Sequence, residues 1–343
     1  MTTTTAPSGA PTARLLLPAD ATEAEWHATR RAGIGGSDVA AILGLDKYRG
    51  PRHVYEAKHG RPDFVDSESA EIGREIEDFI GYLFSKKSGI EVVTPPGTLV
   101  HTEHAWMLAN VDRYALDTFG QVAGPLECKN RSEYQLQDWE EGVPDAPALQ
   151  CHWYMAVGGW DHGYVAALVG GNKLRWHRIE RDEEMTGWLV DKLGDWFRRH
   201  IVEGVPPEAD GLEATTELLA RLWSVQPEAV AEIDLATAKE LRARRADLKE
   251  RAKTIAADLR TVENEMRRLT GEAEIAKADG QPAWTWKQNG AFAPKKFREA
   301  HPDLAAEYTH LVEAIDTDRL KDEKPEIYSQ FRARVLNVPA KGV

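Results

Sequence analysis

Residues 105–131 read AWMLANVDRYALDTFGQVAGPLECKNR, and this stretch decides the expected fold. Two mainly apolar runs, Trp106–Leu116 and Gln121–Lys129, flank the turn-forming residues Asp117–Gly120. Two such runs joined by a short turn that contains glycine predict a β-hairpin. The hairpin is therefore the expected centre of a sheet, and the other elements are placed relative to it.

The hairpin carries the clearest candidate site of the chain. Strand side chains alternate between faces, so Glu127 and Lys129 share one face, Cys128 lies on the other, and Asp112 lies across the hairpin. Two converging carboxylates suit a hard cation such as Mg²⁺. A bound metal can activate water and neutralise charge on a scissile phosphate, and Lys129 would hold the water or stabilise negative charge. The alternative is an ordinary surface Glu–Lys pair on a strand, because short motifs often arise by chance.

Helical and strand patterns alternate around the hairpin. Apolar residues at helical spacing predict a helix over residues 70–88, and a further helix is expected over Ala148–Val157. Gly163–Val169 and Leu174–Ile179 read as strands joined by a turn at residues 170–172. These patterns indicate an α/β class, with a mixed sheet flanked by helices.

A second candidate site lies in the helix–turn–helix expected over residues 26–46. The turn is Gly33-Ile34-Gly35-Gly36, and Ser37 is a good N-cap for the helix that follows. Glycines let backbone approach a phosphate, a helix N-terminus favours anions, and Arg30 would add a bidentate contact. The alternative is a capped helix with a flexible entry turn. The pattern is neither a Walker loop nor a dinucleotide fingerprint, because no Gly-Lys-Ser/Thr follows and no strand precedes it.

Two further polar residues lie on expected helices. Glu77 shares a helix face with Gly73 beside an apolar stripe, so it is either a third carboxylate of the metal site or a boundary residue. Gln150, near the start of its helix, has the same two readings.

Composition limits the class of protein. The chain has 343 residues, 42% of them hydrophobic, a net charge of −13 and two cysteines. The cysteines argue against a disulfide scaffold and an iron–sulfur cluster, and they suit a reducing cytoplasm. No run approaches the ~18 apolar residues of a membrane span, and residues 1–18 resemble a disordered tail rather than a signal peptide. The acidic total counts against nucleic acid as a first expectation, although local charge decides binding.

The expected core, residues 19–204, ends at Val205-Pro206-Pro207, and residues 205–234 read as a linker with short helices. A long helix follows over residues 235–270, with ten Lys or Arg and six Asp or Glu. Its apolar positions form a heptad pattern, interrupted by Arg245, that mainly specifies helix pairing. The members of this pattern are Leu241, Arg245, Leu248, Ala252, Ile255, Leu259, Val262, Met266 and Leu269. Residues 271–343 are expected to form a small α+β module, with strands at 284–287 and 332–338 around a helix at 302–313.

Taken in order, these segments resemble the YqaJ-type viral recombinase family, which includes the exonuclease of phage lambda and belongs to the PD-(D/E)xK nuclease superfamily. The resemblance spans about residues 26–185. It rests on Trp26-His27-Ala28-Thr29-Arg30, Gly33-Ile34-Gly35-Gly36-Ser37-Asp38, Gly73-x-x-x-Glu77, Asn110-Val111-Asp112, Glu127-Cys128-Lys129, Gly142-Val143-Pro144 and Gln150.

The resemblance implies a restriction-endonuclease-like core. It implies Mg²⁺, with Mn²⁺ as a substitute, bound by Asp112, Glu127 and the backbone carbonyl of Cys128, with Lys129 catalytic. Glu77 and Gln150 would lie close by. Arg30 and Ser37 match the positions that hold the 5′-phosphate of a DNA end. One departure stands beside the first acid, because Arg113 replaces the glycine that usually follows it.

The function that the resemblance implies is a Mg²⁺-dependent 5′→3′ exonuclease. It would act on linear double-stranded DNA in a bacterial or phage-infected cell and leave 3′ overhangs for recombination. Relatives work with a single-strand annealing protein, and some form ring-shaped trimers whose channel would keep positive charge inside. Two alternatives remain open. One is a non-catalytic DNA-binding or assembly protein that retains the fold, and the other is a structure-specific endonuclease.

Overall fold

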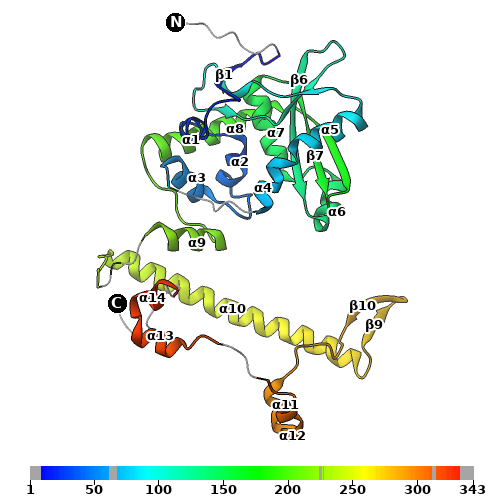
Figure 1. The fold of residues 1–343 in the computed structure, drawn as a ribbon, viewed down its shortest axis with the longest axis vertical. Helices are drawn as coiled ribbons and strands as arrows, with labels where there is room; N and C mark the ends of the chain where they lie inside the picture. The colour runs from blue at the N-terminus through cyan, green and yellow to red at the C-terminus, as the bar shows by residue number, and fades with distance from the viewer. Residues whose placement is uncertain (1–8, 62–67, 224–225, 227, 311–313, 333–343) are drawn as a thin grey trace. The chain divides into compact units, whose positions relative to one another are not determined.

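The computed structural model describes residues 9–61, 68–223, 226, 228–310 and 314–332. The chain divides into two compact units, residues 1–225 and residues 226–343 (Figure 1). Each unit has its own elements and is treated by itself below. Among the described residues, no helix combines the length and the apolarity that a membrane span requires.

A mixed sheet forms the centre of the first unit. Its five strands follow the order β2-β5-β6-β7-β8, and they are Val92–Val93, Arg113–Leu116, Val122–Arg131, His162–Val169 and Lys173–Glu180. β6 and β7 are parallel, and the other neighbours are antiparallel. Parallel strands need a crossover connection, which α7 (Asp145–Gly158) supplies. The expected α/β class with a mixed central sheet is confirmed.

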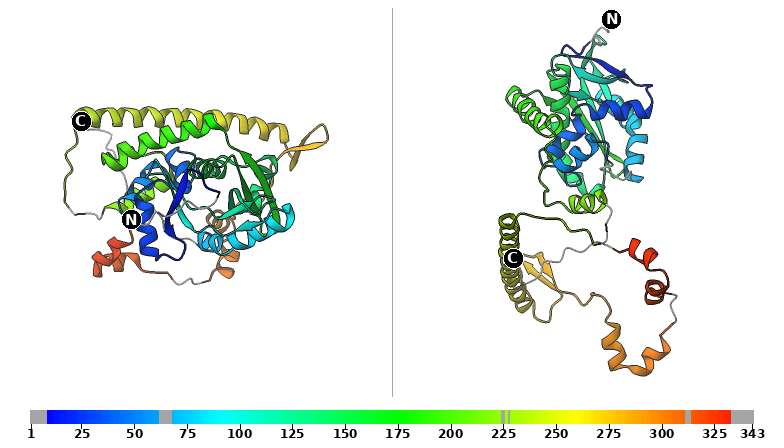
Figure 2. Two further views of the ribbon diagram at one scale, coloured as in Figure 1. Left: turned by 90° about the horizontal axis from the view of Figure 1, so that it is seen from above. Right: turned by 90° about the vertical axis from the view of Figure 1, so that its left-hand side faces the viewer.

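Helices cover both faces of this sheet. α5 (Glu77–Ser88) contacts four of the strands from one side, and α7 contacts β6 and β7 (Figures 1 and 2). Cys128 belongs to the cluster of buried residues that contains Ile80 and Phe84 of α5. Val165 and Trp153 belong to the larger cluster on the α7 side. Because strand side chains alternate, Glu127 and Lys129 lie on the α7 side of the sheet.

The strand expected over residues 106–116 is wrong as a single element. The chain forms β4 (Leu108–Ala109) and β5, which belong to different sheets. β4 pairs with β3 (Gly97–His101), and the Thr98 hydroxyl donates a 2.6 Å hydrogen bond to Asn110 Oδ1 where the chain leaves β4. A mainly apolar run does not reveal a change of partner strand, so this break could not be predicted from the local pattern.

The disordered tail expected over residues 1–18 is also corrected. Ala13–Pro18 forms β1, which pairs antiparallel with β3. The burial of β1 alternates from residue to residue, with Ala13 fully buried and Leu16 exposed. This alternation is typical of a half-buried strand. Residues 1–8 lie outside the described residues.

The helix expected over residues 70–88 is broken. It forms α4 (Glu68–Glu75) and α5, and Ile76 between them has φ −99° and ψ 0°. The break makes Glu77 the first residue of α5. The segment expected as helix, turn and helix over residues 26–46 forms α1 (Glu23–Arg31) and α2 (Gly36–Ile42). A third helix, α3 (Pro51–Lys58), follows.

The first unit extends beyond the boundary expected at residue 204. α9 (Glu213–Leu222) lies in the expected linker but packs on α3, where Leu218 is fully buried and His53 Nε2 lies 3.2 Å from the Ala214 carbonyl. A short helix was expected in this segment, but its packing on α3 was not, because that contact joins residues far apart in the chain. The remaining elements of the unit are the 3₁₀ turn η1 (Glu133–Gln135), α6 (Leu136–Glu141), α8 (Glu183–Trp196) and the π-helical turn η2 (Phe197–Val202).

The second unit begins with α10 (Leu235–Thr270), whose bounds agree with the expected long helix. β9 (Ile275–Ala278) and β10 (Gln281–Thr285) then form an antiparallel hairpin that includes part of the strand expected at 284–287. Four short helices follow: α11 (Pro294–Ala300), α12 (Pro302–Glu307), α13 (Thr317–Glu323) and α14 (Pro325–Gln330). The helix expected over residues 302–313 thus ends early, at Glu307, and residues 311–313 lie outside the described residues. Residues 333–338 of the expected last strand also lie outside them.

Candidate active site

Asp112 lies immediately before the first residue of β5, beside the longer strand β6. The last pair of the β5–β6 ladder joins Arg113 to Leu126. One residue beyond it, Asp112 Oδ2 accepts a 2.7 Å hydrogen bond from the backbone N–H of Cys128. The N–H and C=O groups of one residue in an extended strand point to the same side. The carbonyl of Cys128 therefore faces the same edge of β6 as the Asp112 side chain.

Glu127 and Lys129 form an ion pair on β6, in which Glu127 is buried and the Lys129 side chain is 21% exposed. The ammonium of Lys129 donates a short hydrogen bond to Glu127 Oε1, and Glu127 is only 1% exposed. Burial lowers the pKa of Lys129, but the charges of Glu127 and Asp112 outweigh it, and the pKa is raised overall. Among the described residues, Glu127 Oε2 has no hydrogen-bond partner. A buried carboxylate oxygen without a partner is costly, so this atom is a candidate ligand position.

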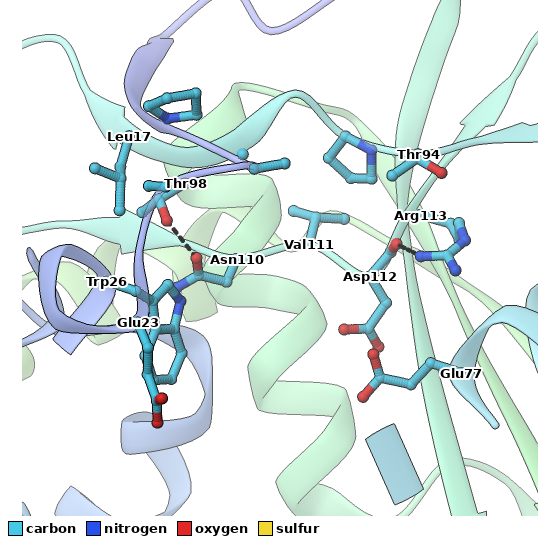
Figure 3. A pocket seen from close by; sticks show the side chains of 15 residues that line it. Leu17, Glu23, Trp26, Glu77, Thr94, Thr98, Asn110, Val111, Asp112 and Arg113 are labelled. Carbon is cyan, nitrogen blue, oxygen red and sulfur yellow. Dashed lines mark hydrogen bonds between the residues drawn. The ribbon is translucent and has the colours of Figure 1, made fainter. Parts of the chain in front are cut away.

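The side chains of Glu77 and Asp112 point toward each other (Figure 3). Burial and the charge of Glu127 raise the pKa of Asp112 well above its usual range. The same two causes raise the pKa of Glu77. Carboxylates that resist ionisation together are typical of sites that a cation or a shared proton neutralises. The structure thus brings Glu77, Asp112 and Glu127 together with Lys129.

Arg113, the departure from the family pattern, turns away from these carboxylates (Figure 3). Its guanidinium pairs with Asp78 of α5 and donates to the Asp112 backbone carbonyl. Its stem packs 3.2 Å from where a Cβ on Gly81 would lie, so a larger residue at 81 would push against it. Arg113 therefore ties β5 to α5 beside the site and leaves the carboxylate oxygens free of a direct contact with its own side chain.

A cleft of about 530 Å³ opens beside the carboxylates. Asp112 and Glu77 line one part of it, and Trp26 of α1 lines another, together with residues of β1 and β3 (Figure 3). Arg30, on the same helix, holds its guanidinium 5.1 Å from the centre of the Trp26 ring. The cleft thus leads from the carboxylates toward the second candidate site.

The second site brings Arg30 and Ser37 together. Arg30 Nη2 donates a 2.8 Å hydrogen bond to Ser37 Oγ and lies 3.7 Å from Asp38 Oδ1. Arg49 lies 3.4 Å from the same oxygen, and Lys58 Nζ donates a 2.6 Å hydrogen bond to Asp38 Oδ2. Three cations surround one carboxylate, so the local charge is positive in an acidic chain.

Asp38 and Lys58 have structural roles that the sequence did not reveal. Both are buried, and Lys58 also donates a 2.7 Å hydrogen bond to the Arg30 carbonyl. Burial alone would raise the pKa of Asp38, but the charges of Lys58, Arg30 and Arg49 hold that pKa well below its usual range. The position of Asp38 in the first turn of α2 was a sign of capping, but no pattern marked Lys58 as its partner.

Gln150 connects the two sites through α7. It is buried, and its side-chain amide donates a 2.8 Å hydrogen bond to the Tyr154 hydroxyl. A Cβ on Gly36 of α2 would lie 2.5 Å from Tyr154 Cε1 and 2.9 Å from Gln150 Cγ. Only glycine permits this approach, so α2 lies directly against Gln150. Burial and the charges of Glu127 and Asp112 raise the pKa of Tyr154 well above its usual range.

The residues fit a hard metal ion, although no three His, Cys, Asp or Glu side chains form a metal centre in the described part of the chain. The expected ligands are two carboxylates, on Asp112 and Glu127, and one backbone carbonyl. Mg²⁺ commonly binds proteins through one or two carboxylates and keeps several waters. The unpartnered Glu127 Oε2 and the raised pKa of Asp112 agree with a cation at this position.

Comparisons with known proteins identify the family. A sequence model described as the YqaJ-like viral recombinase domain matches residues 25–161. The uncharacterized protein YqaJ of Bacillus subtilis (strain 168) is 31% identical over 314 residues, which cover 90% of each chain. The chain belongs to the YqaJ family. The resemblance found in the sequence is therefore confirmed, and the alignment with YqaJ extends well past the nuclease-like segment into the second unit.

Solved structures similar to this YqaJ-family chain include two of the alkaline exonuclease LHK-Exo from Laribacter hongkongensis. The one in complex with dAMP has 19% identity and a TM-score of 0.44, with 52% of this chain and 93% of that one covered. The other has 18% identity and a TM-score of 0.44, with 58% and 100% covered. A phage-related exonuclease from Haemophilus somnus 129PT has 13% identity and a TM-score of 0.40, with 50% and 96% covered.

Proposed function

We propose that the chain is a metal-dependent 5′→3′ exonuclease that acts on ends of linear double-stranded DNA and leaves 3′ overhangs for recombination. Membership of the YqaJ family supports a nuclease role. The observation that carries the proposal is the proximity of Glu77, Asp112 and Glu127 to one another, with the ammonium of Lys129 hydrogen-bonded to Glu127. A plain surface Glu–Lys pair would not bury Glu127 to 1% exposure or raise the pKa of a neighbouring aspartate.

Asp112, Glu127 and the Cys128 carbonyl would hold Mg²⁺ or Mn²⁺, which when bound supplies an activated water and neutralises phosphate charge. Glu127 keeps Lys129 protonated and fixed in direction through their hydrogen bond. Lys129 can then stabilise negative charge on the phosphate or orient the attacking water. Glu77 and Gln150 would position groups around this centre.

The proposed polarity rests on the second site. Arg30 and Ser37 lie together, and the surrounding cations outnumber the single carboxylate of Asp38. Such a site suits a terminal phosphate, and a guanidinium binds phosphate oxygens in a bidentate manner. Because α2 contacts Gln150, a gripped end would stand at a fixed distance from the carboxylates. An enzyme that holds the 5′ end and cleaves beside it degrades that strand from its 5′ end.

Two assembly features belong to the same proposal. A single-strand annealing protein would receive the 3′ overhang, and a ring-shaped trimer would place the cationic second site inside a channel. Both follow from the resemblance to recombination exonucleases, and the setting would be a bacterial or phage-infected cell.

Digestion of linear duplex DNA, labelled at either end of one strand, tests the proposal. We expect nucleotide release from the 5′-labelled end with Mg²⁺ or Mn²⁺, none with EDTA, and a preference for 5′-phosphate over 5′-hydroxyl ends. Intact closed circular DNA is expected to survive. Nicking of the circle would favour the endonuclease alternative. Absence of cleavage together with absence of Mg²⁺ binding by calorimetry would favour a non-catalytic DNA-binding protein.

A further inference from the structure

The apolar heptad stripe of α10 is uncovered. Only Thr270, the last residue of the helix, is buried. Leu241, Leu248 and Ile255 are 58%, 50% and 64% exposed, and Leu259, Val262 and Leu269 are 57%, 58% and 60% exposed. A stripe of this length in water is expected to find a partner helix. In Figure 1 the helix is drawn as one uninterrupted rod.

The charges beside the stripe identify the partner. The stripe alternates between the a positions 245, 252, 259 and 266 and the d positions 241, 248, 255, 262 and 269. The flanking e and g positions of the N-terminal half are all basic: Arg242, Arg244, Lys249 and Arg251. Those of the C-terminal half are acidic, apart from Ala256 and the terminal Thr270: Asp258, Glu263 and Glu265. One helix thus carries opposite charge at its two ends along a single seam.

A parallel pairing of two copies is unfavourable with this distribution. In a parallel coiled coil, each g residue faces the e residue five positions later on the partner helix. Arg244 would face Lys249, and Asp258 would face Glu263. Each pair brings like charges together, and twofold symmetry repeats both. The charges at e and g therefore oppose the parallel dimer.

An antiparallel pairing brings the basic e and g residues of one helix opposite the acidic ones of the other. Reversing one helix brings g positions opposite g positions and e opposite e. Arg251 then faces Asp258 of the second copy, Arg244 faces Glu265, and Arg242 faces Glu263. Symmetry repeats each attractive pair. Glu263 and Glu265 already contact Arg267 and Arg268 on their own helix, but such exposed pairs contribute little and are easily exchanged.

The apolar seam closes in the same register. With Arg251 opposite Asp258, Leu248 of one helix packs beside Leu259 of the other, and Ile255 beside Ala252. The outer layers join Leu241 to Met266 and Arg245 to Val262. All members of the stripe from 241 to 266 are matched by one alignment, which is centred between residues 253 and 254. A single polar seam residue, Arg245, would disfavour shifted registers, as buried polar groups do in coiled coils.

We infer that α10 is a self-association helix that pairs antiparallel with α10 of a second copy of this chain, with Arg251 opposite Asp258. The surface is independent of the candidate active site, so the inference does not rest on the proposed function. An antiparallel pair extends in opposite directions from its centre, so the two first units would leave the paired helices at opposite ends of the rod. One such pairing joins two chains, in addition to any assembly that the first unit forms by itself.

Charge reversal in the full chain tests the inference, with mass measured by sedimentation equilibrium. Arg251→Glu and Asp258→Arg each replace two attractive pairs by two repulsive ones, so each is expected to weaken association on the order of tenfold and lower the average mass toward half. An equimolar mixture of the two variants, and the double variant R251E/D258R, are expected to recover the wild-type mass, because attraction is restored in both. Lys253→Glu, in the same helical turn but outside the seam, is the matched control and should leave the mass unchanged.

Three outcomes would overturn the inference. Equal mass for wild type, R251E and D258R would show that α10 does not pair with a second copy. Tighter association of D258R would indicate the parallel arrangement, where this change removes the repulsion with Glu263. If the equimolar mixture of R251E and D258R keeps the lowered mass of the single variants, residues 251 and 258 do not face each other. Circular dichroism of each variant checks that α10 stays helical, so a change in mass reports pairing.

Discussion

Two helices of this protein, α7 and α10, differ sharply in what covers them. Eleven of the 14 residues of α7 are buried, whereas one of the 36 residues of α10 is buried. α7 lies between the central sheet on one side and α2 and α8 on another. Its sequence is apolar almost all round, as expected for a helix inside a core. α10 has a narrow apolar stripe and charged residues everywhere else.

The difference shows two ways to stabilise a helix. α7 depends on tertiary packing, because isolated helices of its length are marginal in water. α10 is long and carries ion pairs such as Arg267–Glu263 and Arg268–Glu265 on its surface. Each such pair contributes only ~0.2–0.5 kcal/mol, so the length of α10 matters more than any single pair. The buried helix can therefore hold functional groups in fixed positions, and the uncovered helix offers a surface for another molecule.

The largest expected effect is the loss of nuclease activity when a lysine of the candidate active site is removed, compared with the removal of an exposed lysine of α10. Lys129→Ala removes the ammonium beside the carboxylate cluster, so nucleotide release should fall at least ~100-fold, with DNA binding retained. Lys253→Ala, on the exposed face of α10, is the control and should leave the rate unchanged. The measurement is acid-soluble label released from linear duplex DNA with Mg²⁺. Wild-type release by the Lys129 variant would remove this residue from the mechanism.

Asp38→Asn comes next. It leaves the ammonium of Lys58 buried without its carboxylate, which should cost about 3–5 kcal/mol of unfolding free energy at neutral pH. Because the pKa of Asp38 is held below its usual range, its stabilisation is present above about pH 4 and is lost as pH falls through the folded pKa. The difference in unfolding free energy between the wild type and Asp38→Asn should therefore become smaller in acid. Urea unfolding at several pH values measures it, and Asp247→Asn on α10, which removes an exposed carboxylate, should change little.

Two methionine-to-alanine substitutions, one in α7 and one in α10, allow the stability contributions of the two helices to be compared directly. Met155 of α7 is fully buried, and Met155→Ala should lower the unfolding free energy by about 2–5 kcal/mol. Met266 lies in the stripe of α10, and Met266→Ala should cost less than ~1 kcal/mol for the isolated chain. Denaturant unfolding of both variants at low protein concentration gives the comparison. An equal loss at both sites would mean that α10 is covered within its own chain.

The smallest expected effect concerns the contact that joins α2 to α7. Gly36→Ala places a methyl group 2.5 Å from Tyr154 Cε1, so the unfolding free energy should fall by about 1–3 kcal/mol. Gly187 of α8 has no atom within 4 Å of its would-be Cβ. Gly187→Ala should therefore raise helix stability by ~0.5–1 kcal/mol. Thermal unfolding should show a lower stability for Gly36→Ala and a higher stability for Gly187→Ala. Changes of the same sign in both variants would refute the close approach of α2 to α7.

The sequence predicted the elements whose patterns are local. The bounds of α10 agree with the expected residues 235–270, because a heptad pattern that runs from Leu241 to Leu269 has few competing interpretations. β6 and α7 were found within a few residues, and the resemblance to the YqaJ family was confirmed. The pairing of Arg30 with Ser37 was also anticipated, since both lie beside one glycine-rich turn.

The sequence missed what depends on distant partners. The break between β4 and β5, the pairing of β1 with β3 and the packing of α9 on α3 all join segments far apart in the chain. Lys58 gave no sign of its burial against Asp38, because a lysine in an ordinary helical pattern reads as solvent-exposed. The same limit applied to Glu77, whose helix looked continuous and in fact restarts at that residue.

By itself, then, the sequence determined the family, the elements with a strong local pattern such as β6, α7 and α10, and the identity of the groups around Asp112, Glu127 and Lys129. The tertiary structure decided which of these groups share a site. Residue type and local periodicity are properties of short stretches, and a sequence records them directly. Burial is a property of the whole fold, and it is burial that raises the pKa of Asp112, leaves Glu127 Oε2 without a partner and sets Gly36 against Gln150.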